Sequence, residues 1–319
     1  MNELLIETPG MLTTLQDAGR FGYQQYGVSP AGPMDARSFA LVNCLVGNPM
    51  DACGLEISYL GPVIRINADT VFAVTGGDLS PELNGTPIPS YCAIRAKAGD
   101  VLQFGAMHGK GSRAYLAFAG GLDAPLVMNS RSTLVRNHIG GLHGDKLKKG
   151  DCISLLDPEA GGKLNHIERR KIEPEKFGEG SECVLRVVLG PQASSFTRKG
   201  IRHFFWFPFR ITDEFDRMGC RLKREEAVEH LGDGNIISDG IAFGSIQVPP
   251  NGQPIIMLAD RQSTGGYAKI GTVISVDLPL LAQGVPGDTV RFVETDVDLA
   301  QTLYLRQLSN LKKLAEMWK

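Results

Sequence analysis

The sequence lacks the features that mark several large classes of protein. No apolar stretch approaches the length needed to cross a bilayer, and the first ten residues, MNELLIETPG, do not have the form of a secretory signal peptide. The charge is close to balance, at −2 for 319 residues, and no run of Lys and Arg is interleaved with aromatic residues. These absences argue against a membrane protein and a nucleic-acid-binding protein, and they predict a cytoplasmic location.

Metal-binding and phosphate-binding motifs are also missing. The six cysteines form no C-x-x-C pair, and the closest histidines, His138 and His143, have no carboxylate at ligand spacing. The glycine-rich turns at 75–78 and 119–123 have neither of the spacings used by nucleotide-binding loops. We therefore predict no metal site and no recognisable ATP-binding loop in this chain.

What the sequence contains in abundance is short apolar runs separated by turn residues. Between residues 55 and 118 such runs recur about every ten residues, a spacing typical of a β-barrel or β-sandwich. Glu56 interrupts one of these runs, so its side chain is either exposed at an edge or paired. Three predicted strands follow a Gly-Asp pair, at 99–100, 150–151 and 287–288, which hints at two related β-domains.

Two segments have the pattern of helices. Gly32-Pro33 is predicted to open a helix with Pro33 at its first position and Asp35 in its first turn, because an apolar pattern at helical spacing follows and ends before Gly47. There Asp35 either only stabilises the helix or marks an N-terminus that faces an anionic ligand. The C-terminal segment has an apolar stripe, and Thr295 and Asp298 resemble a capping box at its start.

Two further segments in the second half have a marked composition. The aromatic run Phe204–Phe207 is predicted to be a strand that the core or a partner must cover. Residues 213–222, DEFDRMGCRL, form a polar loop that contains Arg217 and Arg221.

The stretch from Gly244 to Asp277 combines the highest density of polar side chains with apolar runs. The runs at 255–258 and 273–274 are predicted to be buried strands, so the polar side chains stand at a strand end and in the glycine-rich loop after it. That placement gives a site both rigidity and access, although a surface turn with solvated charges is the alternative. The polar side chains are Gln247, Asp260, Arg261, Gln262, Thr264, Tyr267, Lys269 and Asp277.

A second candidate region is the irregular segment at 13–35. A long irregular segment in a compact domain is either functional or disordered, and the aromatic residues in this one favour function. Gln16, Asp17 and Arg20 are close enough in sequence to share one small site.

Several motifs together resemble the biotin-dependent carboxyltransferase family, also described as allophanate hydrolase subunit 2-like. They are TTLQDAGRFGYQQYGVSPAGPMD, GLEISYLGP, AVTGGD, RAYLAFAGG, NSRST and GSIQVPPNGQPIIMLADRQSTGGYAKIGTVISVDL, in register from about Thr13 to Phe292. The family includes the carboxyltransferase part of urea carboxylase, the C component of 5-oxoprolinase and the kinase-inhibitor antagonists of bacilli. The sequence departs from the family at Asn129-Ser130, where Gly-Ser is more usual.

The resemblance implies a mainly β fold with a few helices, built as two cyclophilin-like β-barrel domains. The predicted domains are residues 1–160, which include a leading active-site loop, and residues 183–294, followed by a C-terminal helix at 295–319. The polar interval from Asp157 to Glu182 has the composition of a linker between them.

The resemblance also implies a function, with alternatives. Stand-alone chains of this kind are expected to be the C component of an ATP-dependent 5-oxoprolinase, a hydrolase that opens 5-oxoproline to L-glutamate. Such a chain works with a homologous cyclophilin-like subunit and a lactam-processing subunit, and is inactive alone. The alternatives are a regulatory module that antagonises a histidine-kinase inhibitor, and a carboxyltransferase that acts on urea or a related amide with carboxybiotin.

All of these functions predict a hetero-oligomer, and a homo-oligomer is a further option. The chain has no Ala-Met-Lys-Met biotin attachment motif, so any biotin or ATP step belongs to a partner chain.

The substrates of these reactions share a planar unit with an N–H and a C=O group, which needs an acceptor, a donor and a polarising cation. The candidate catalytic residues, which are carboxylates for the N–H proton and cations for the carbonyl, are Asp260, Asp35, Lys269 and Arg20. The candidate substrate-binding residues are Gln16, Asp17, Glu56, Gln247, Arg261, Gln262, Thr264, Tyr267 and Asp277.

Overall fold

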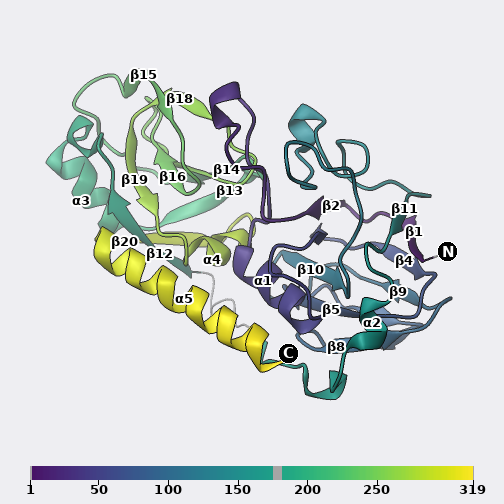
Figure 1. The fold of residues 1–319 in the computed structure, drawn as a ribbon. Helices are drawn as coiled ribbons and strands as arrows, with labels where there is room; N and C mark the ends of the chain where they lie inside the picture. The colour runs from purple at the N-terminus through teal and green to yellow at the C-terminus, as the bar shows by residue number, and fades with distance from the viewer. Residues whose placement is uncertain (1, 175–181, 319) are drawn as a thin grey trace. The chain divides into compact units, whose positions relative to one another are not determined.

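The computed structural model describes residues 2–174 and 182–318, which form two compact units (Figure 1). The first unit takes in residues 2–20, 31–174 and 309–318, and the second takes in 21–30 and 182–308. Both are built mainly from strands with few helices, so the mainly β part of the fold prediction is confirmed. No helix in the described ranges is long and apolar enough to cross a membrane.

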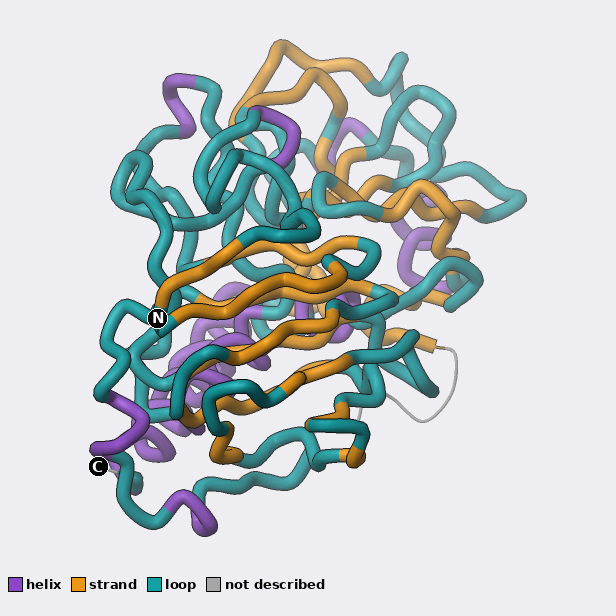
Figure 2. Tube along the Cα trace, turned by 90° about the vertical axis from the view of Figure 1, so that its right-hand side faces the viewer, coloured by secondary structure: helices purple, strands orange, loops and turns teal. Residues whose placement is uncertain are grey.

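The first unit contains two antiparallel sheets, with strand orders β11-β1-β4-β9-β6-β7 and β2-β3-β10-β5-β8. Figure 2 shows strands of the six-stranded sheet side by side near the N-terminus. The strands are β1 (Glu3–Thr8), β2 (Leu12–Gln16), β3 (Gly54–Ser58), β4 (Val63–Ile66), β5 (Thr70–Gly76), β6 (Glu82–Leu83), β7 (Thr86–Pro87), β8 (Ala93–Ala96), β9 (Val101–Gln103), β10 (Arg113–Phe118) and β11 (Cys152–Ser154). The helices are α1 (Ala36–Leu45), α2 (Ala160–Lys163), η2 (Val135–Asn137) and η3 (Ile167–Arg169).

Alternation along the five-stranded sheet sends side chains into two different cores. On β10, Leu116 and Phe118 belong to the core that also contains Leu4 and Ile64 of the other sheet. Tyr115 and Ala117, which alternate with them on β10, belong to a second core with Phe39 and Val42 of α1. Because side chains alternate along a strand, one sheet can bury both of its faces.

Helix α1 begins later than the sequence pattern predicts. Asp35 is its N-cap, and its side chain accepts hydrogen bonds from the backbone N–H and the hydroxyl of Ser38 at 2.9 and 2.7 Å. Pro33 therefore lies before the helix and not at its first position. Gly47 follows the C-cap with a φ of 76°, in the left-handed region that favours glycine.

Three turns of the same construction precede β9, β11 and β20, at the Gly-Asp pairs seen in the sequence. In each turn an Asp side chain accepts the backbone N–H of the residue three positions earlier. The distances are 2.7, 2.8 and 3.1 Å at Asp100, Asp151 and Asp288. The glycine before each Asp has a φ between 90° and 99°, so this pair of residues specifies the turn by itself.

The second unit contains a closed barrel with the strand order β12-β19-β16-β17-β14-β13-β20. The barrel strands are β12 (Glu182–Leu189), β13 (Phe209–Phe215), β14 (Gly219–Lys223), β16 (Ser245–Gln247), β17 (Ile255–Met257), β19 (Lys269–Val273) and β20 (Thr289–Thr295). A separate hairpin is formed by β15 (Asn235–Gly240) and β18 (Thr264–Tyr267). The helices are α3 (Arg198–Trp206), α4 (Leu278–Ala282), η1 (Gln24–Tyr26) and η4 (Ala193–Ser195), and α5 (Val297–Met317) follows β20.

The barrel closes where β12 pairs in parallel with β20 from Glu182 to Val188. The first unit has two sheets in place of a single closed one, so the expectation of two cyclophilin-like barrels, like the predicted domain bounds of 1–160 and 183–294, stays a prediction. Part of the predicted linker, residues 175–181, lies outside the described residues. Its earlier part contains α2 and η3.

The aromatic run at 204–207 is mostly helical, so its prediction as a strand is wrong. Thr197 caps α3 by accepting the backbone N–H of Gly200 at 2.9 Å, and the helix continues to Trp206. Phe204 is fully buried and stacks on Phe292 of β20 with the ring centroids 4.3 Å apart. Trp206, two residues later, is exposed, as expected for a helix with one buried stripe.

Helix α5 starts where the sequence predicts, but with a different cap. The Asp296 side chain accepts the backbone N–H of Leu299 at 2.7 Å, a role that the sequence pattern gave to Thr295. None of its residues is buried. In the first unit, the Arg170 guanidinium donates to the carbonyl of Trp318, just after α5.

Replacing Phe204 by Ala should reduce the free energy of unfolding by about 3–5 kcal/mol, because a large ring is removed from a packed aromatic cluster. Trp206→Ala is the matched control, and its effect should stay within about 0.5 kcal/mol because that ring is exposed. Urea unfolding followed by circular dichroism measures both values. Equal losses from the two variants would contradict the helical packing described above.

Candidate functional site

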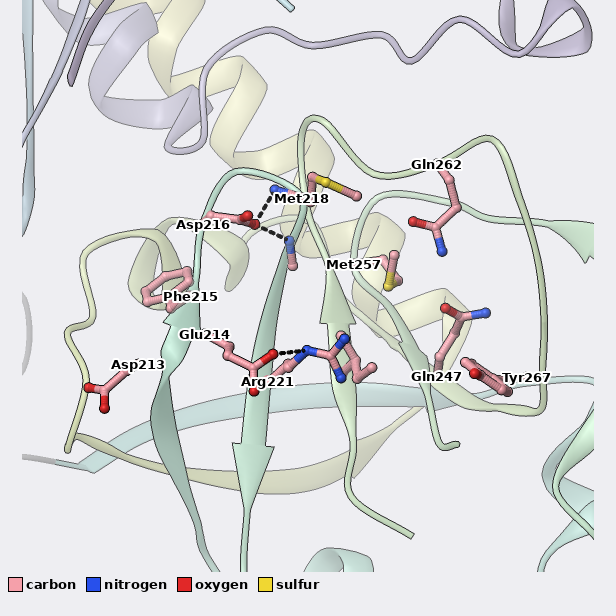
Figure 3. Close-up of a pocket in the computed structure, with 12 residues that line it drawn as sticks. Asp213, Glu214, Phe215, Asp216, Met218, Arg221, Gln247, Met257, Gln262 and Tyr267 are labelled. Atoms are coloured by element: carbon pink, nitrogen blue, oxygen red, sulfur yellow. Dashed lines mark hydrogen bonds and ion pairs between the residues drawn. The ribbon is translucent and has the colours of Figure 1, made fainter. Parts of the chain in front are cut away.

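A pocket of about 400 Å³ lies in the second unit, between the rims of barrel strands and the β15–β18 hairpin (Figure 3). Strands β13, β14, β16, β17 and β18 and the turns that follow them supply its walls. The lining residues are Asp213, Glu214, Phe215, Asp216, Met218, Gly219, Arg221, Gln247, Ile255, Met257, Gln262 and Tyr267. Three of the predicted substrate-binding residues, Gln247, Gln262 and Tyr267, therefore share one pocket.

Gln247 is the most deeply buried polar side chain in this lining, with 2% of its surface exposed. It ends β16, where its backbone is fixed by pairing with Ile255 on one side and Lys269 on the other. Its Nε2 is buried and has no hydrogen-bond partner among residues 2–174 and 182–318. Buried amides are almost always paired, so this one is a candidate for pairing with a ligand.

Gln262 and Tyr267 supply further polar groups near Gln247, as Figure 3 shows. Both are partly exposed, and Tyr267 is 39% exposed. An amide and a phenol can each donate and accept a hydrogen bond without carrying charge at neutral pH. This side of the pocket is suited to a neutral polar ligand.

The other side of the pocket carries charge and two thioethers. Arg221 pairs with Glu214 at 2.8 Å, and both side chains are at least half exposed. Asp216 accepts the backbone N–H groups of Met218 and Gly219, which fixes the turn between β13 and β14. These residues were not among the site residues predicted from the sequence. The available signal was the polar segment 213–222, which contains Arg217 and Arg221.

Asp260 does not line the pocket but stabilises its wall through an ion pair with Arg217. Its two carboxylate oxygens accept Nε and an Nη of Arg217 at 3.0 and 2.8 Å, and both side chains are 5% exposed. The backbone N–H of Asp260 also donates to the carbonyl of Arg217 at 2.8 Å. The pair joins the turn that carries Met218 to the loop that carries Gln262.

Arg261 and Lys269 are also held by other groups. Arg261 donates to the carbonyls of Ile241 and Leu258 at 3.0 and 3.2 Å, and burial lowers its pKa to about 10, which leaves it charged at neutral pH. Lys269 donates to the carboxylate of Asp239 at 2.5 Å and to the carbonyl of Gly240 at 2.8 Å. This interaction ties the barrel to strand β15 of the hairpin.

The remaining two predicted residues of this stretch lie away from the pocket lining. Thr264 is exposed at the start of β18. Asp277 pairs with Arg186 through both carboxylate oxygens, at 2.9 and 2.5 Å, and also accepts the Arg186 backbone N–H. Its partners give Asp277 a structural role beside β12.

In the first unit, Gln16, Asp17 and Arg20 do act together, but on the backbone of one loop. The Asp17 carboxylate accepts hydrogen bonds from the hydroxyls of Ser130 and Ser132, each at 2.6 Å. Arg20 donates to the carbonyl of Ser132 at 2.8 Å. Gln16 donates to the carbonyl of Thr133 at 3.2 Å.

The loop at 127–133 contains Asn129 with a φ of 60°, which explains why Asn can replace the usual Gly there.

Glu56 and Asp35 meet through Tyr115. The Tyr115 hydroxyl donates to Glu56 at 2.9 Å and accepts the backbone N–H of Asp35 at 2.8 Å. Glu56 is 1% exposed and also accepts the backbone N–H of Met34 at 2.7 Å, so it is paired and not at an exposed edge. Burial, with the neighbouring Glu56 and Asp35 carboxylates, raises the Tyr115 pKa well above its usual value, so the hydroxyl keeps its proton.

Among the described residues, no group of three or more His, Cys, Asp and Glu side chains is placed to hold a metal ion. The predicted site residues therefore divide between the two units, with the pocket residues in the second. The catalytic and binding roles assigned to them stay predictions.

The profile of the carboxyltransferase domain, subdomain A and B, matches residues 26–294 of the chain. The chain belongs to this carboxyltransferase-domain family. The family resemblance seen in the sequence motifs is thus confirmed.

Three relatives show how far the likeness of this carboxyltransferase-domain chain extends. The chain is 34% identical to the 5-oxoprolinase C component of Escherichia coli (strain K12), over 96% of this chain and 97% of that protein. It is 32% identical to urea amidolyase of Lachancea kluyveri, over 98% of this chain and 18% of that protein. The crystal structure of K. lactis urea amidolyase superimposes with a TM-score of 0.90 at 30% identity, over 98% of this chain and 20% of that chain.

Removing one partner of the Arg217–Asp260 pair should destabilise this carboxyltransferase-domain chain more than removing both. Asp260→Asn removes the charge of the carboxylate that pairs with the buried guanidinium of Arg217, which should cost about 3–5 kcal/mol, whereas the double variant R217M/D260L should cost much less. Urea unfolding of the two single variants and the double variant measures the coupling. Additive losses would show that the two side chains do not depend on each other.

Proposed function

We propose that the chain is the C component of an ATP-dependent 5-oxoprolinase, a hydrolase that opens 5-oxoproline to L-glutamate together with companion subunits. The observation that carries the proposal is the extent of the match. The chain covers 97% of the E. coli 5-oxoprolinase component but 18% of the L. kluyveri urea amidolyase. Nearly all of the oxoprolinase component thus has a counterpart in this chain, at 34% identity.

The chemistry of the pocket supports a lactam as the ligand. The uncharged side chains of Gln247, Gln262 and Tyr267 suit the N–H and C=O groups of a lactam. The exposed Arg221–Glu214 pair is weak because water screens it, so a substrate carboxylate can replace Glu214 on the guanidinium. 5-Oxoproline has both a lactam and a carboxylate.

Ring opening breaks the bond between the lactam carbonyl carbon and the nitrogen, while water supplies a hydroxyl to the carbon and a proton to the nitrogen. We assign ATP binding to a companion subunit, because this sequence has no recognisable phosphate-binding loop. The proposed companions are a homologous cyclophilin-like subunit and a lactam-processing subunit. An assembly that consumes ATP works in the cytoplasm, as the sequence predicts.

The predicted catalytic residues Asp260 and Lys269 fit this proposal as positioning residues. Each is engaged in an ion pair, with Arg217 and Asp239, that holds a segment lining or covering the pocket. Asp35 caps α1 and Arg20 supports the loop at 127–133, so their contribution in the first unit is proposed to be positional as well.

A second candidate function is carboxyl transfer to urea or a related amide. The observation that favours it is the 0.90 TM-score with K. lactis urea amidolyase over 98% of this chain. In that case carboxybiotin arrives on a partner chain, and the same neutral side chains of the pocket bind an amide without a carboxylate.

The deciding experiment measures glutamate release from 5-oxoproline and ATP by the chain co-expressed with its two companions. Omitting the chain should abolish release, and Gln262→Ala should reduce it at least about ten-fold, since a hydrogen bond to the substrate is lost. Gln103→Ala, an exposed glutamine on β9, is the matched control and should leave the rate unchanged.

An assembled complex that releases no glutamate would refute the oxoprolinase proposal. Urea-dependent consumption of carboxybiotin by the same preparation would then establish the second candidate.

A further inference from the structure

The carboxamide of Gln247 has an arrangement that the fold alone does not account for. It is 2% exposed at the end of a barrel strand, it lines the pocket, and its Nε2 has no hydrogen-bond partner in the described residues. A buried amide N–H without a partner is unfavourable for folding, so an apolar residue of the same size would stabilise the barrel better.

We propose that the Gln247 carboxamide recognises a ligand through a paired N–H and C=O edge, and that the lack of a side chain at Gly265, which packs on Nε2, gives the carboxamide room at this position. This inference rests on the proposed function for its choice of a lactam as the physiological ligand. It goes further in assigning the recognition of both groups to one side chain.

The geometry of a carboxamide restricts the ligand class. A primary amide places an acceptor oxygen and a donor N–H on the same edge, so it can form two parallel hydrogen bonds only with a ligand that presents them in the complementary order. A lactam or a cyclic urea does so because its ring holds the N–H and C=O groups cis. An ordinary linear secondary amide is trans and offers only one of them at a time.

Gly265 lies directly over this carboxamide. A Cβ at position 265 would stand 2.5 Å from Nε2 of Gln247 and 2.7 Å from Cδ1 of Ile241. Neither Gly265 nor Gly266 has a positive φ, so the backbone does not demand glycine at either place. A Cβ at 266 would have its nearest neighbour at 3.5 Å, an ordinary contact. Glycine is therefore needed at 265 for space, and the neighbouring glycine is a built-in control.

The strand that carries Gly265 is able to adjust to a ligand. β18 forms a ladder with β15 only, and this two-stranded sheet is separate from the barrel. Lys269 of β19 connects the hairpin to the barrel by donating to the carboxylate of Asp239, which lies opposite Gly265 across the hairpin, and to the carbonyl of Gly240. Movement of β18 to admit a ligand edge to Nε2 breaks no ladder hydrogen bond of the barrel.

The test combines stability with binding, measured on the full chain by ligand-observed NMR and calorimetry with L-5-oxoproline. Gln247→Met, which keeps the size of the side chain, should leave the Tm unchanged or raise it while weakening 5-oxoproline binding at least about ten-fold. Gly265→Ala should weaken binding to a similar degree, and Gly266→Ala should not. Gln103→Met on β9 controls for the change of residue type.

Ligand analogues test the paired edge itself. N-methyl-5-oxoproline, which has no N–H, and L-proline, which has no ring carbonyl, should bind at least about ten-fold more weakly than 5-oxoproline to the wild-type chain. Imidazolidin-2-one should retain competition through its cis N–H and C=O groups. Equal binding of the N-methyl compound, or wild-type binding by Gln247→Met, would overturn the proposal, as would an absence of 5-oxoproline binding by the wild-type chain and its complex.

The two proposals can fail separately. If binding follows the predicted pattern but the assembled complex releases no glutamate, the recognition edge stands and the oxoprolinase function falls. If glutamate release requires this chain but Gln247→Met supports it at the wild-type KM and kcat, the function stands and the assignment of Gln247 falls.

Discussion

The ion pair between Arg217 and Asp260 is the interaction on which the second-unit pocket depends. The two residues are far apart in sequence, yet four atoms of their side chains form two hydrogen bonds in a buried environment. Burying both charges is costly, and the pair is tolerated because each group satisfies the other. The ion pair fixes the position of the turn that carries Met218 relative to the loop that carries Gln262. The wall of the pocket is thereby set by electrostatics and not by apolar packing alone.

The same logic divides the polar residues of the second unit into two groups. The charged residues predicted for the site in this unit include the catalytic candidates Asp260 and Lys269 and the binding candidate Arg261, and each of these three is held by a counter-ion or by backbone carbonyls. The neutral carboxamide of Gln247 is buried and has no such partner in the described part of the chain. A low-dielectric interior makes an unpaired charge far more expensive than an unpaired amide, so the group left for a ligand is the neutral one.

Local patterns were sufficient to predict most of the strands and the two longest helices. The runs at 63–66 and 114–118 alternate or are buried on both faces, and each is a strand in the structure. The Gly-Asp turns could be predicted because the required φ and the side-chain hydrogen bond both lie within four residues. The aromatic run at 204–207 was wrongly predicted to be a strand because consecutive large apolar residues favour strands. The competing helix signal, the Thr197 cap and the single buried ring of Phe204, depends on contacts with β20 that no local window contains.

The candidate site could be predicted as a region but not as an arrangement. The stretch at 244–277 contains Gln247, Gln262 and Tyr267, but nothing local says that Asp260 pairs with a residue 43 positions earlier. From the sequence, Asp260 looks available for catalysis because it is next to Arg261. Its ion pair with the distant Arg217 gives it a structural role instead.

The proposed recognition of an N–H and C=O edge by Gln247 also bears on why the chain is similar both to oxoprolinase components and to urea amidolyases. Urea, a lactam and a cyclic urea differ in size and charge, but each can present an N–H group cis to a C=O group. A single buried carboxamide at a rigid strand end recognises that edge without specifying what lies beyond it. Discrimination between substrates then depends on the exposed rim of the pocket. There the Arg221 guanidinium can bind a substrate carboxylate or stay paired with Glu214. Under this proposal, changes at the rim alter the substrate, whereas recognition of the shared edge requires Gln247 and the glycine at 265 that packs on it.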